Sequence, residues 1–254
     1  MNSQETEIEK EKELEQKVQE YWTCRAHDFS TVRKNELKDN EISGRWLAEI
    51  GQNLPVSSGL DILDVGTGTG YFAILLALHG HRTTGIDFTR AMLQEAEETA
   101  DSYAANASFL YMDAQALDFP DNSFDAIVTR NLTWTIPEPE KAYQEWHRVL
   151  RPGGILLNFD ASYADNVRNH NQKESYVSSK DVYGHCGITP ELEKKNAEIT
   201  LSMPGSCKSR PRWDIELLSK IGFSNVSVDK TAGQRILREK DLPDAPLFLI
   251  YAKK

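Results

Sequence analysis

The amino-acid sequence predicts an α/β fold in which a mostly parallel sheet carries helices on both faces. Three observations support this prediction. Short apolar runs alternate with helical segments from residue 60 to residue 160, as is typical of parallel strands joined by helices. A glycine-rich turn joins the first apolar run to the helix that follows it. The length of 254 residues, of which 39% are hydrophobic and 27% charged, suits one globular domain with additions.

Two helices are predicted ahead of the sheet. The segment Glu5–Tyr21 is rich in Glu and Lys, and we expect a solvated helix whose single apolar stripe packs on the body of the protein. A second helix is expected over Ser43–Asn53, before Pro55 and a turn that ends at Gly59. The stripe of the first helix consists of Ile8, Leu14, Val18 and Tyr21.

The predicted sheet begins with the apolar run Leu60–Val65. The segment Tyr71–His79 behind the glycine-rich turn is apolar on all sides, so we expect a buried helix there. Right-handed crossovers then determine how the following strands are arranged. Further strands are expected at Thr83–Ile86, Ser108–Met112, Asp125–Thr129 and Ile155–Phe159, and further helices at Arg90–Tyr103 and Glu140–Leu150.

The alternation stops between Ala161 and Arg210, where the sequence is polar and holds one fair helical segment, Pro190–Ile199. We interpret this stretch as an insertion above the carboxyl edge of the sheet, where α/β proteins place their binding loops. A helix at Trp213–Ile221 and strands at Asn225–Val228 and Pro246–Ala252 are expected to complete the sheet. The expected organisation is an N-terminal helical cap (1–53), a core (54–160), a lid insertion (161–210) and the C-terminal part of the core sheet (211–254).

Composition disfavours several classes of protein. The formal charge of −10, without a dense run of Lys or Arg, is unlike the basic surface that binds nucleic acid. The polar N-terminus does not resemble a signal peptide and no apolar stretch is long enough to span a bilayer, so we expect a cytoplasmic protein that does not bind membranes. Cys24, Cys186 and Cys207 form no CxxC pair, which argues against both disulfides and a structural zinc site.

The turn after the first strand has the composition of a ligand-binding loop. Asp64 lies near the end of the strand, and the spacing Gly66-x-Gly68-x-Gly70 leads directly into a helix. Glycines let the backbone turn tightly and approach a ligand, next to the free amide groups of the helix. The dinucleotide-binding pattern is GxGxxG, so the GxGxG spacing and the preceding carboxylate favour a ligand with an ammonium group over a pyrophosphate.

Two further carboxylates follow the next two strands. Asp87 can accept hydrogen bonds from both hydroxyls of a ribose, which suits dinucleotides and other nucleoside ligands alike. Asp113 can accept a hydrogen bond from an adenine amino group, while Phe88 and Met92 flank the ring. Since the carboxyl ends of consecutive parallel strands meet in one crevice, we expect the three aspartates to belong to a single site.

Four segments, in unbroken order between Leu60 and Phe159, resemble the motifs of the class I S-adenosylmethionine-dependent methyltransferases: LDVGTGTG, GIDFTRAML, MDAQALDFPDNSFDAIVTRN and RVLRPGGILL. The likeness is closest to the small-molecule branch that includes the methyltransferases of ubiquinone and menaquinone biosynthesis. The resemblance implies a Rossmann-like sheet of seven strands with an antiparallel last strand, and S-adenosyl-L-methionine as cofactor.

The resemblance also implies a role for each part of the motifs. Asp64 and the glycine loop would hold the methionine end of the cofactor, Asp87 the ribose, and Asp113 the adenine. The residues after the fourth strand would line the methionine and methyl side. The expected cofactor-binding residues are Asp64, Gly66, Thr67, Gly68, Gly70, Asp87, Phe88, Met92, Asp113, Ala114, Arg130 and Asn131.

The activity that the resemblance implies is transfer of a methyl group to a small-molecule acceptor by in-line displacement. The sulfonium methyl is already activated, so holding the acceptor at roughly 3–3.5 Å supplies most of the acceleration. A general base is required only for an acceptor that must lose a proton. Around the insertion the candidates are Asp160, Tyr163, His170 and His185, each of which also has an ordinary structural explanation, so no residue is assigned as catalytic.

The segment after the fourth strand bears on the acceptor. Methyltransferases that act on amines of nucleic acids and glutamine often carry an Asn/Asp-Pro-Pro-aromatic turn here, whereas this chain has Arg130-Asn131-Leu132-Thr133-Trp134. That difference disfavours such amines as acceptors. Trp134 is the better candidate for an acceptor pocket, because Trp146 and Trp213 lie on predicted helices and are expected in the core.

Several alternatives remain open at this stage. The segment Gln19–Phe29 resembles a cap in which an aromatic side chain closes over the cofactor, although docking of the first helix explains it equally well. An NAD-dependent oxidoreductase is disfavoured by the loop spacing and Asp113, and a non-catalytic S-adenosylmethionine-binding or regulatory module is the other alternative. No metal is expected, because the adjacent His185 and Cys186 chelate one ion poorly. The expected partner is a small-molecule methyl acceptor, and a homodimer is left open.

Overall fold

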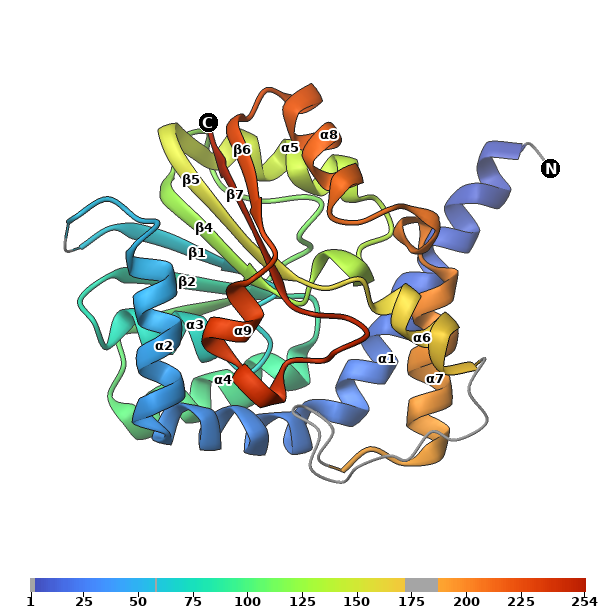
Figure 1. Cartoon of the computed structure of the whole chain (residues 1–254), viewed down its shortest axis with the longest axis horizontal. Coiled ribbons are helices and arrows are strands. Elements are labelled where there is room, and N and C mark those ends of the chain that lie inside the picture. Colours follow the sequence, from blue (N-terminus) through green and yellow to red (C-terminus); the bar gives the residue numbers. More distant parts are fainter. Residues whose placement is uncertain (1–2, 58, 172–186) are drawn as a thin grey trace.

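The computed structural model describes residues 3–57, 59–171 and 187–254 of the chain. Within these residues one seven-stranded sheet has the strand order β3-β2-β1-β4-β5-β7-β6 (Figure 1). Strand β7 is antiparallel to both of its neighbours, while the other pairs are parallel. This arrangement confirms the predicted sheet and its antiparallel last strand. The strands are β1 (Asp61–Val65), β2 (Arg82–Asp87), β3 (Ala107–Tyr111), β4 (Phe124–Arg130), β5 (Leu150–Asp160), β6 (Ser224–Asp229) and β7 (Phe248–Lys253).

The register of the parallel strands brings their carboxyl ends to one edge. Asp64 of β1 lies opposite Gly85 of β2 and Val128 of β4. The residues that follow these three positions therefore leave the sheet at a similar level along the strand direction. Because parallel strands share one direction, the loops that follow β1, β2, β3 and β4 gather at the same edge of the sheet.

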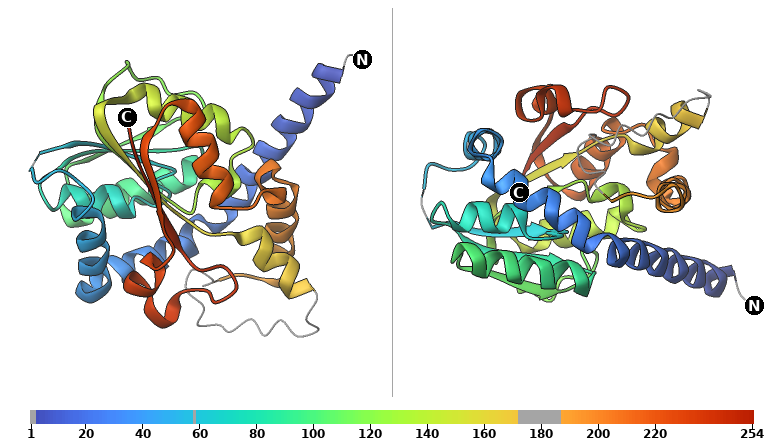
Figure 2. Two further views of the ribbon diagram at one scale, coloured as in Figure 1. Left: turned by 45° about the horizontal axis from the view of Figure 1, so that its top comes forward. Right: turned by 90° about the horizontal axis from the view of Figure 1, so that it is seen from below.

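Helices cover both faces of the sheet (Figure 2). One face packs on α2 (Asn40–Gly51), α3 (Tyr71–Ala77), α4 (Arg90–Tyr103) and α9 (Ala232–Ile236). At its centre the ring of Trp46 makes edge-to-face contacts with Phe72 and Phe159, with ring centroids 5.0 and 5.2 Å apart. The other face packs on α5 (Pro139–Val149) and α8 (Arg212–Ile221). Trp146 is fully buried there as predicted, whereas Trp213 is only partly buried at the margin of this second core.

The first helix differs from its prediction. Helix α1 runs unbroken from Ser3 to Lys38, well past the expected end near Tyr21, because the sequence between these positions has neither Gly nor Pro to stop it. Its N-terminal turns project beyond the rest of the molecule (Figures 1 and 2). Leu14, Val18 and Tyr21 of the apolar stripe pack on α7 (Pro190–Ser202) of the insertion and not on the sheet, whereas the Ile8 side chain lies outside the described residues. The residues of this contact are Leu14, Val18, Tyr21, Trp22, Leu192, Ile199 and Met203.

The insertion contains more helix than its sequence predicts. Besides α7, residues Tyr163–Asn171 form α6, which the polar composition of that stretch concealed because it lacks an apolar stripe. Helix α6 packs beside α7, and α7 lies next to α1 (Figure 2). A 3-10 turn, η2 (Pro204–Cys207), leads back toward α8. The insertion and the N-terminal helix together cover the carboxyl edge of the sheet.

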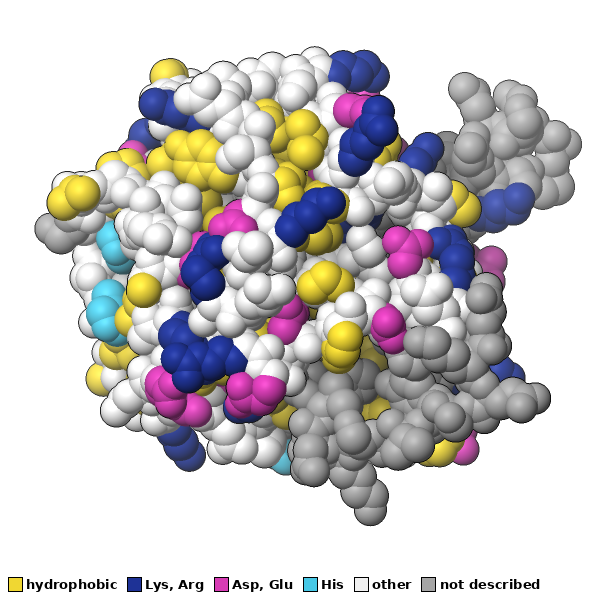
Figure 3. All heavy atoms as spheres, viewed as in Figure 1, with side chains coloured by type: hydrophobic (Ala, Val, Ile, Leu, Met, Phe, Trp, Pro, Cys, Tyr) yellow, Lys and Arg dark blue, Asp and Glu magenta, His cyan; other side chains and the backbone are white. Residues whose placement is uncertain are grey.

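The surface shown in Figure 3 has mixed charge. Lys and Arg side chains are interspersed with Asp and Glu over this face, without a continuous basic area among the residues drawn in colour. None of the helices in the described part of the chain is both long and apolar enough to cross a membrane.

The junction between α1 and α2 generates a testable prediction about stability. The Asp39 carboxylate accepts hydrogen bonds from the backbone N–H groups of Glu41 (2.9 Å) and Ile42 (3.3 Å), which caps α2. Replacing Asp39 with Ala should lower the free energy of unfolding by about 1 kcal/mol, as loss of an N-cap usually does. Urea titration of both variants checks this, since Asp39→Asn keeps a capping oxygen and should stay close to the wild type. Equal losses in the two variants would contradict the cap.

Candidate functional site

One large cavity, of about 700 Å³, lies at the carboxyl edge of the sheet beneath α1, α6 and α7. Its volume falls within the roughly 300–1,000 Å³ of small-molecule and cofactor sites. Of the twelve residues predicted to bind a cofactor, eleven line this cavity. They are Asp64, Gly66, Thr67, Gly68, Asp87, Phe88, Met92, Asp113, Ala114, Arg130 and Asn131.

Gly70 is the exception among the predicted site residues, because it does not line the cavity. It caps α3 in the left-handed region, with φ +83°, and its Cα faces the protein interior. A Cβ at this position would lie 3.0 Å from both the Ala96 Cβ and the Phe109 Cζ. Gly70 therefore serves the close packing of α3 against its neighbours.

The first half of the cavity is formed by the glycine loop and its carboxylates. Asp64 is buried and accepts hydrogen bonds from the Thr67 hydroxyl (2.6 Å) and the Ala73 N–H (3.1 Å). Asp87 accepts one bond from the Gly68 N–H (2.8 Å) and another from the Thr89 N–H (2.9 Å). These bonds fix the loop against the ends of β1 and β2. Both bonds to Asp64 end on its Oδ2, so its Oδ1 can accept from a ligand.

Burial dominates the ionisation of these two carboxyl groups. It raises the pKa of Asp64 to about 7, against the lowering effect of the hydrogen bonds from Thr67 and Ala73. It likewise raises the pKa of Asp87 to about 6, against the bonds from Gly68 and Thr89. A cationic group placed beside Asp64 would offset this cost, so the pair favours a positively charged ligand at that end.

The third predicted carboxylate, Asp113, sits in a network that the sequence did not reveal. Its Oδ1 accepts a hydrogen bond from the backbone N–H of Gln115 (2.8 Å). The Gln115 amide in turn donates to Glu15 of α1 (3.2 Å) and accepts from the Glu138 N–H (2.7 Å). Gln115 therefore joins the loop after β3 to the N-terminal helix and to the loop before α5.

Arg130, at the end of β4, is held by buried partners from the first two helices. Its Nη1 lies 3.1 Å from Glu36 Oε1, and the same oxygen accepts a hydrogen bond from the Trp46 indole (2.7 Å). Arg33 also pairs with Glu36, and the Arg130 guanidinium stacks 4.2 Å above the Trp46 ring. Burial lowers the pKa of Arg130 to about 10, which leaves it charged at neutral pH. Sequence reasoning found Arg130 but not Glu36, because nothing in the spacing of α1 signals this contact.

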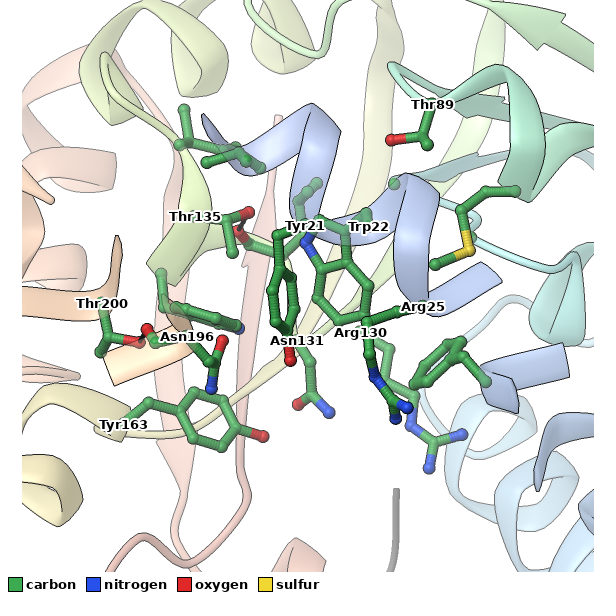
Figure 4. Close-up of a pocket in the computed structure, with 18 of the residues that line it drawn as sticks. Tyr21, Trp22, Arg25, Thr89, Arg130, Asn131, Thr135, Tyr163, Asn196 and Thr200 are labelled. Atoms are coloured by element: carbon green, nitrogen blue, oxygen red, sulfur yellow. Dashed lines mark hydrogen bonds between the residues drawn. The ribbon is translucent and has the colours of Figure 1, made fainter. Parts of the chain in front are cut away.

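The second half of the cavity is rich in aromatic side chains, with charged residues of α1 and α7, such as Arg25 and Glu193, also at its wall. Tyr21 and Trp22 of α1 are in edge-to-face contact, with ring centroids 5.2 Å apart. On the opposite side Trp134, in the 3-10 turn η1 (Thr133–Thr135), packs against Tyr163 of α6 at 5.2 Å. Tyr21, Asn131 and Tyr163 point toward the middle of the cavity from three different segments, and Asn196 and Thr200 of α7 complete the wall (Figure 4).

Several buried polar atoms at the cavity wall make no hydrogen bond within the described chain. The Asn131 Oδ1 and the Trp134 indole N–H are among them. Buried polar groups are normally paired, and an unpaired one typically costs about 1–3 kcal/mol. Unpaired groups at a cavity wall are therefore candidates for contact with a ligand. The prediction that Trp134 lies at a pocket agrees with its position here.

The predicted candidates for a general base lie in different environments. Tyr163 lines the cavity, and burial raises the pKa of its phenol, so the hydroxyl stays protonated. Asp160 does not line the cavity and is instead fully buried in an ion pair with Arg210. The His170 side chain and the whole of His185 lie outside the described residues. Among those that are described, no group of three His, Cys, Asp or Glu side chains is arranged to hold a metal ion.

The cavity has one more wall that the sequence did not indicate. Residues 237–247, between α9 and β7, contribute Leu237, Lys240, Asp241, Leu242, Ala245 and Leu247. This stretch carries no motif, and it approaches the cavity only because β7 runs antiparallel and brings the preceding loop to the carboxyl edge.

Comparison with known proteins gives a consistent set of similarities. A family model described as a methyltransferase domain matches residues 63–158. A phosphatidylethanolamine N-methyltransferase of Cereibacter sphaeroides is 34% identical over 149 residues, which cover 57% of this chain and 68% of that protein. A demethylmenaquinone methyltransferase of Listeria monocytogenes is 32% identical over 135 residues, or 51% of this chain and 56% of that protein. The chain thus spans little more than half the length of the latter relative.

A solved structure supports the fold. Phosphoethanolamine N-methyltransferase 2 of Haemonchus contortus, in complex with S-adenosyl-L-methionine, aligns with a TM-score of 0.58 at 18% identity. The alignment covers 83% of this chain and 52% of that chain. At this level of identity the similarity concerns the Rossmann-like architecture alone.

The packing around the glycine loop predicts different costs for two glycines. Gly70 and Gly80 are both left-handed, with φ +83° and +87°, but a Cβ at Gly80 would meet nothing within 4 Å. Gly80→Ala should lose about 1–2 kcal/mol of unfolding free energy from backbone strain alone. Gly70→Ala should lose a further amount of about 1–3 kcal/mol, because the methyl group overpacks the contact with Ala96 and Phe109. Urea unfolding of the two variants measures the difference, and equal losses would refute the crowding at Gly70.

The raised pKa of Asp64 predicts a pH dependence of stability. In the unfolded chain the pKa is close to 3.8 and in the folded protein about 7, so the folded state binds more protons between these values. Stability from this group is therefore lost as pH rises from about 4 to about 7. Relative to the wild type, Asp64→Asn should gain stability as the pH increases across this window in urea titrations.

A control variant separates this effect from the general charge of the protein. Asp118 is exposed and does not line the cavity. The variant Asp118→Asn should therefore follow the wild-type pH profile. If Asp64→Asn also follows the wild-type pH profile of stability, burial does not hold the Asp64 carboxyl protonated.

Proposed function

This chain belongs to the S-adenosylmethionine-dependent methyltransferases, and we propose that it transfers the methyl group of that cofactor to a small-molecule acceptor by in-line displacement. The observation that carries the proposal is the division of one cavity into two unlike halves. The glycine loop and the strand-end carboxylates form one half. The other half carries aromatic, amide and hydroxyl side chains, together with charged side chains of α1 and α7 such as Arg25 and Glu193.

The residues of the first half fit S-adenosyl-L-methionine. Asp64 and the loop Gly66–Gly68 would face its methionine end, where the ammonium group offsets the cost of a buried carboxylate. Asp87 would accept from the ribose hydroxyls and Asp113 from the adenine amino group, with Phe88 and Met92 beside the ring. The unpaired Asn131 Oδ1, next to Arg130, supports a ligand contact on the methyl side.

The residues of the second half are proposed to bind the acceptor. Helices α1, α6 and α7 cover this space, so the acceptor must be small enough to share about 700 Å³ with the cofactor. The names of two relatives, a phosphatidylethanolamine N-methyltransferase and a demethylmenaquinone methyltransferase, support an acceptor that is neither a protein nor a nucleic acid. The cap (1–53) and the insertion (161–210) are thus proposed to form the acceptor side of the site.

Positioning and exclusion of water are the proposed contributions of the protein. When bound, the cofactor supplies an already activated sulfonium methyl group. The walls from α1 and α6 would orient the acceptor toward it and keep water away. The Tyr163 phenol, whose pKa is raised by burial, would donate a hydrogen bond to the acceptor and would not remove its proton. No general base is assigned among the described residues.

Isothermal titration calorimetry, followed by an acceptor screen, tests this function. S-adenosyl-L-methionine should bind saturably while NADH should not. Transfer from methyl-labelled cofactor would then be measured for phenols and quinols, primary amines and carboxylic acids. Labelled product from one class establishes the activity and its acceptor. Binding without transfer to any class would favour a non-catalytic binding module, and absence of binding would refute the proposal.

The role of Asp87 predicts a specific loss of cofactor affinity. Asp87→Ala removes the carboxylate that would accept from the ribose, and charge-assisted hydrogen bonds contribute about 1.5–3 kcal/mol. The dissociation constant for S-adenosylhomocysteine, measured by calorimetry, should rise about 10- to 100-fold. Asp118→Ala, at an exposed position outside the cavity, is the matched control and should bind like the wild type. Unchanged affinity of Asp87→Ala would remove this residue from the proposed site.

A further inference from the structure

A buried ionic cluster lies behind the acceptor half of the cavity. The Arg210 guanidinium lies 3.0 Å from Asp160 Oδ2, and it binds Asp214 through two bonds of 2.9 and 3.0 Å. The Arg210 side chain is 5% exposed, and both aspartates are completely buried. Two buried carboxylates around one arginine are expensive to desolvate, and an apolar core of similar volume would often be at least as stable.

The cluster includes a side chain from the turn that carries Trp134. Arg210 Nη2 donates to the Thr133 hydroxyl (2.6 Å), and Thr133 donates in turn to Asp160. Asn158 of β5 also donates to Thr133, at 3.3 Å. The Thr133 hydroxyl is thus a junction between the end of β5, the end of the insertion and the turn η1.

The positions of these residues along the chain explain what the junction holds together. Asp160 is the last residue before the insertion and Arg210 is its final residue, so their ion pair joins the two ends of this 50-residue segment. A second bond, from the Ser162 hydroxyl to the Arg210 carbonyl (3.2 Å), reinforces the same closure. The insertion therefore begins and ends at one fixed point beside η1.

The cavity wall starts immediately next to this point. Trp134 follows Thr133 directly, and Tyr163 comes three residues after Asp160. Their rings are in contact and both line the cavity, whereas Thr133, Asp160, Arg210 and Asp214 do not. The cluster can influence an acceptor only through the side chains that it places.

We propose that Arg210 and Thr133 are positioning residues that fix the Trp134–Tyr163 wall of the acceptor half. This inference rests on the proposed function, because it assumes that this wall contacts the acceptor. The ion pair sets where the insertion leaves the sheet, and the Thr133 hydroxyl ties η1 to that point. Loss of the tie should loosen the wall while the glycine loop, which is held by its own bonds to Asp64 and Asp87, stays unchanged.

Hydrogen–deuterium exchange of Thr133→Val tests the tie without need of an acceptor. Valine has the shape of threonine but no hydroxyl, and the Arg210–Asp160–Asp214 pairing remains. Amide exchange should become roughly tenfold faster in peptides covering residues 131–136 and 161–168, the size of effect expected from one charge-assisted hydrogen bond. Peptides of β1 and β2 and the dissociation constant for S-adenosylhomocysteine should not change.

Two matched variants serve as controls. Thr133→Ser keeps the hydroxyl and should restore wild-type exchange. Thr129→Val, on the same strand-and-turn segment, removes a buried hydroxyl that has no hydrogen-bond partner among the described residues, so its exchange should equal the wild type. If Thr133→Val behaves like Thr129→Val, the proposal is wrong. If amide exchange in β1 and β2 also becomes faster, the cluster contributes only to general stability, and the proposal is wrong in that case too.

Kinetics with an acceptor found by the screen add a second readout. Two variants are compared: Thr133→Val, and Arg210→Lys, whose single ammonium group cannot reach both aspartates as the guanidinium does. Each should raise KM for the acceptor by roughly tenfold, while the affinity for the cofactor stays within about twofold. Loss of cofactor affinity in these variants would contradict a role confined to the acceptor wall. If no acceptor is found, the proposed function is in doubt, but exchange in the Thr133 variants still decides whether the tie exists.

Discussion

A buried carboxylate needs hydrogen-bond donors to replace the water that it loses. This requirement determines how the elements around the cavity are joined. The donors to Asp64 come from the glycine loop and α3, and those to Glu36 come from α1, α2 and β4. Asp160 draws its donors from η1 and the end of the insertion. Each buried charge is therefore a point of attachment between segments, and the cap, sheet and insertion are held in place by the same groups that surround the cavity.

The alternation of strands and helices and the convergence of Asp64, Asp87 and Asp113 could be predicted because both are local properties of the sequence. A strand that ends in a carboxylate next to a glycine loop is recognisable within a few residues, and parallel strands place such ends together. Glu36 could not be found in this way, since its partner Arg130 is 94 residues distant. Gly70 was assigned to the ligand because spacing alone does not tell a glycine that faces a ligand from one that faces its own core.

The two largest departures from expectation concern the segments outside the sheet. The apolar stripe of α1 showed that one side of the helix must be covered, but a periodic pattern does not say by what, and the covering element proved to be α7. Helix α6 was missed because its polar sequence carries no stripe at all. The partner of each helix is a tertiary contact, of α1 with α7 and of α6 with α7, which local patterns do not specify.

The contact between α1 and α7 has a consequence for how this chain can diverge. The strand-end carboxylates and the glycine loop sit on the sheet, whereas the opposite wall comes from α1, η1, α6 and α7. Substitutions at positions such as Asn196 or Thr200 alter that wall without touching the bonds of Asp64 or Asp87. Related chains can therefore inherit one half of the cavity intact while the other half accumulates change, and duplicated copies can acquire new specificities by altering two helices alone.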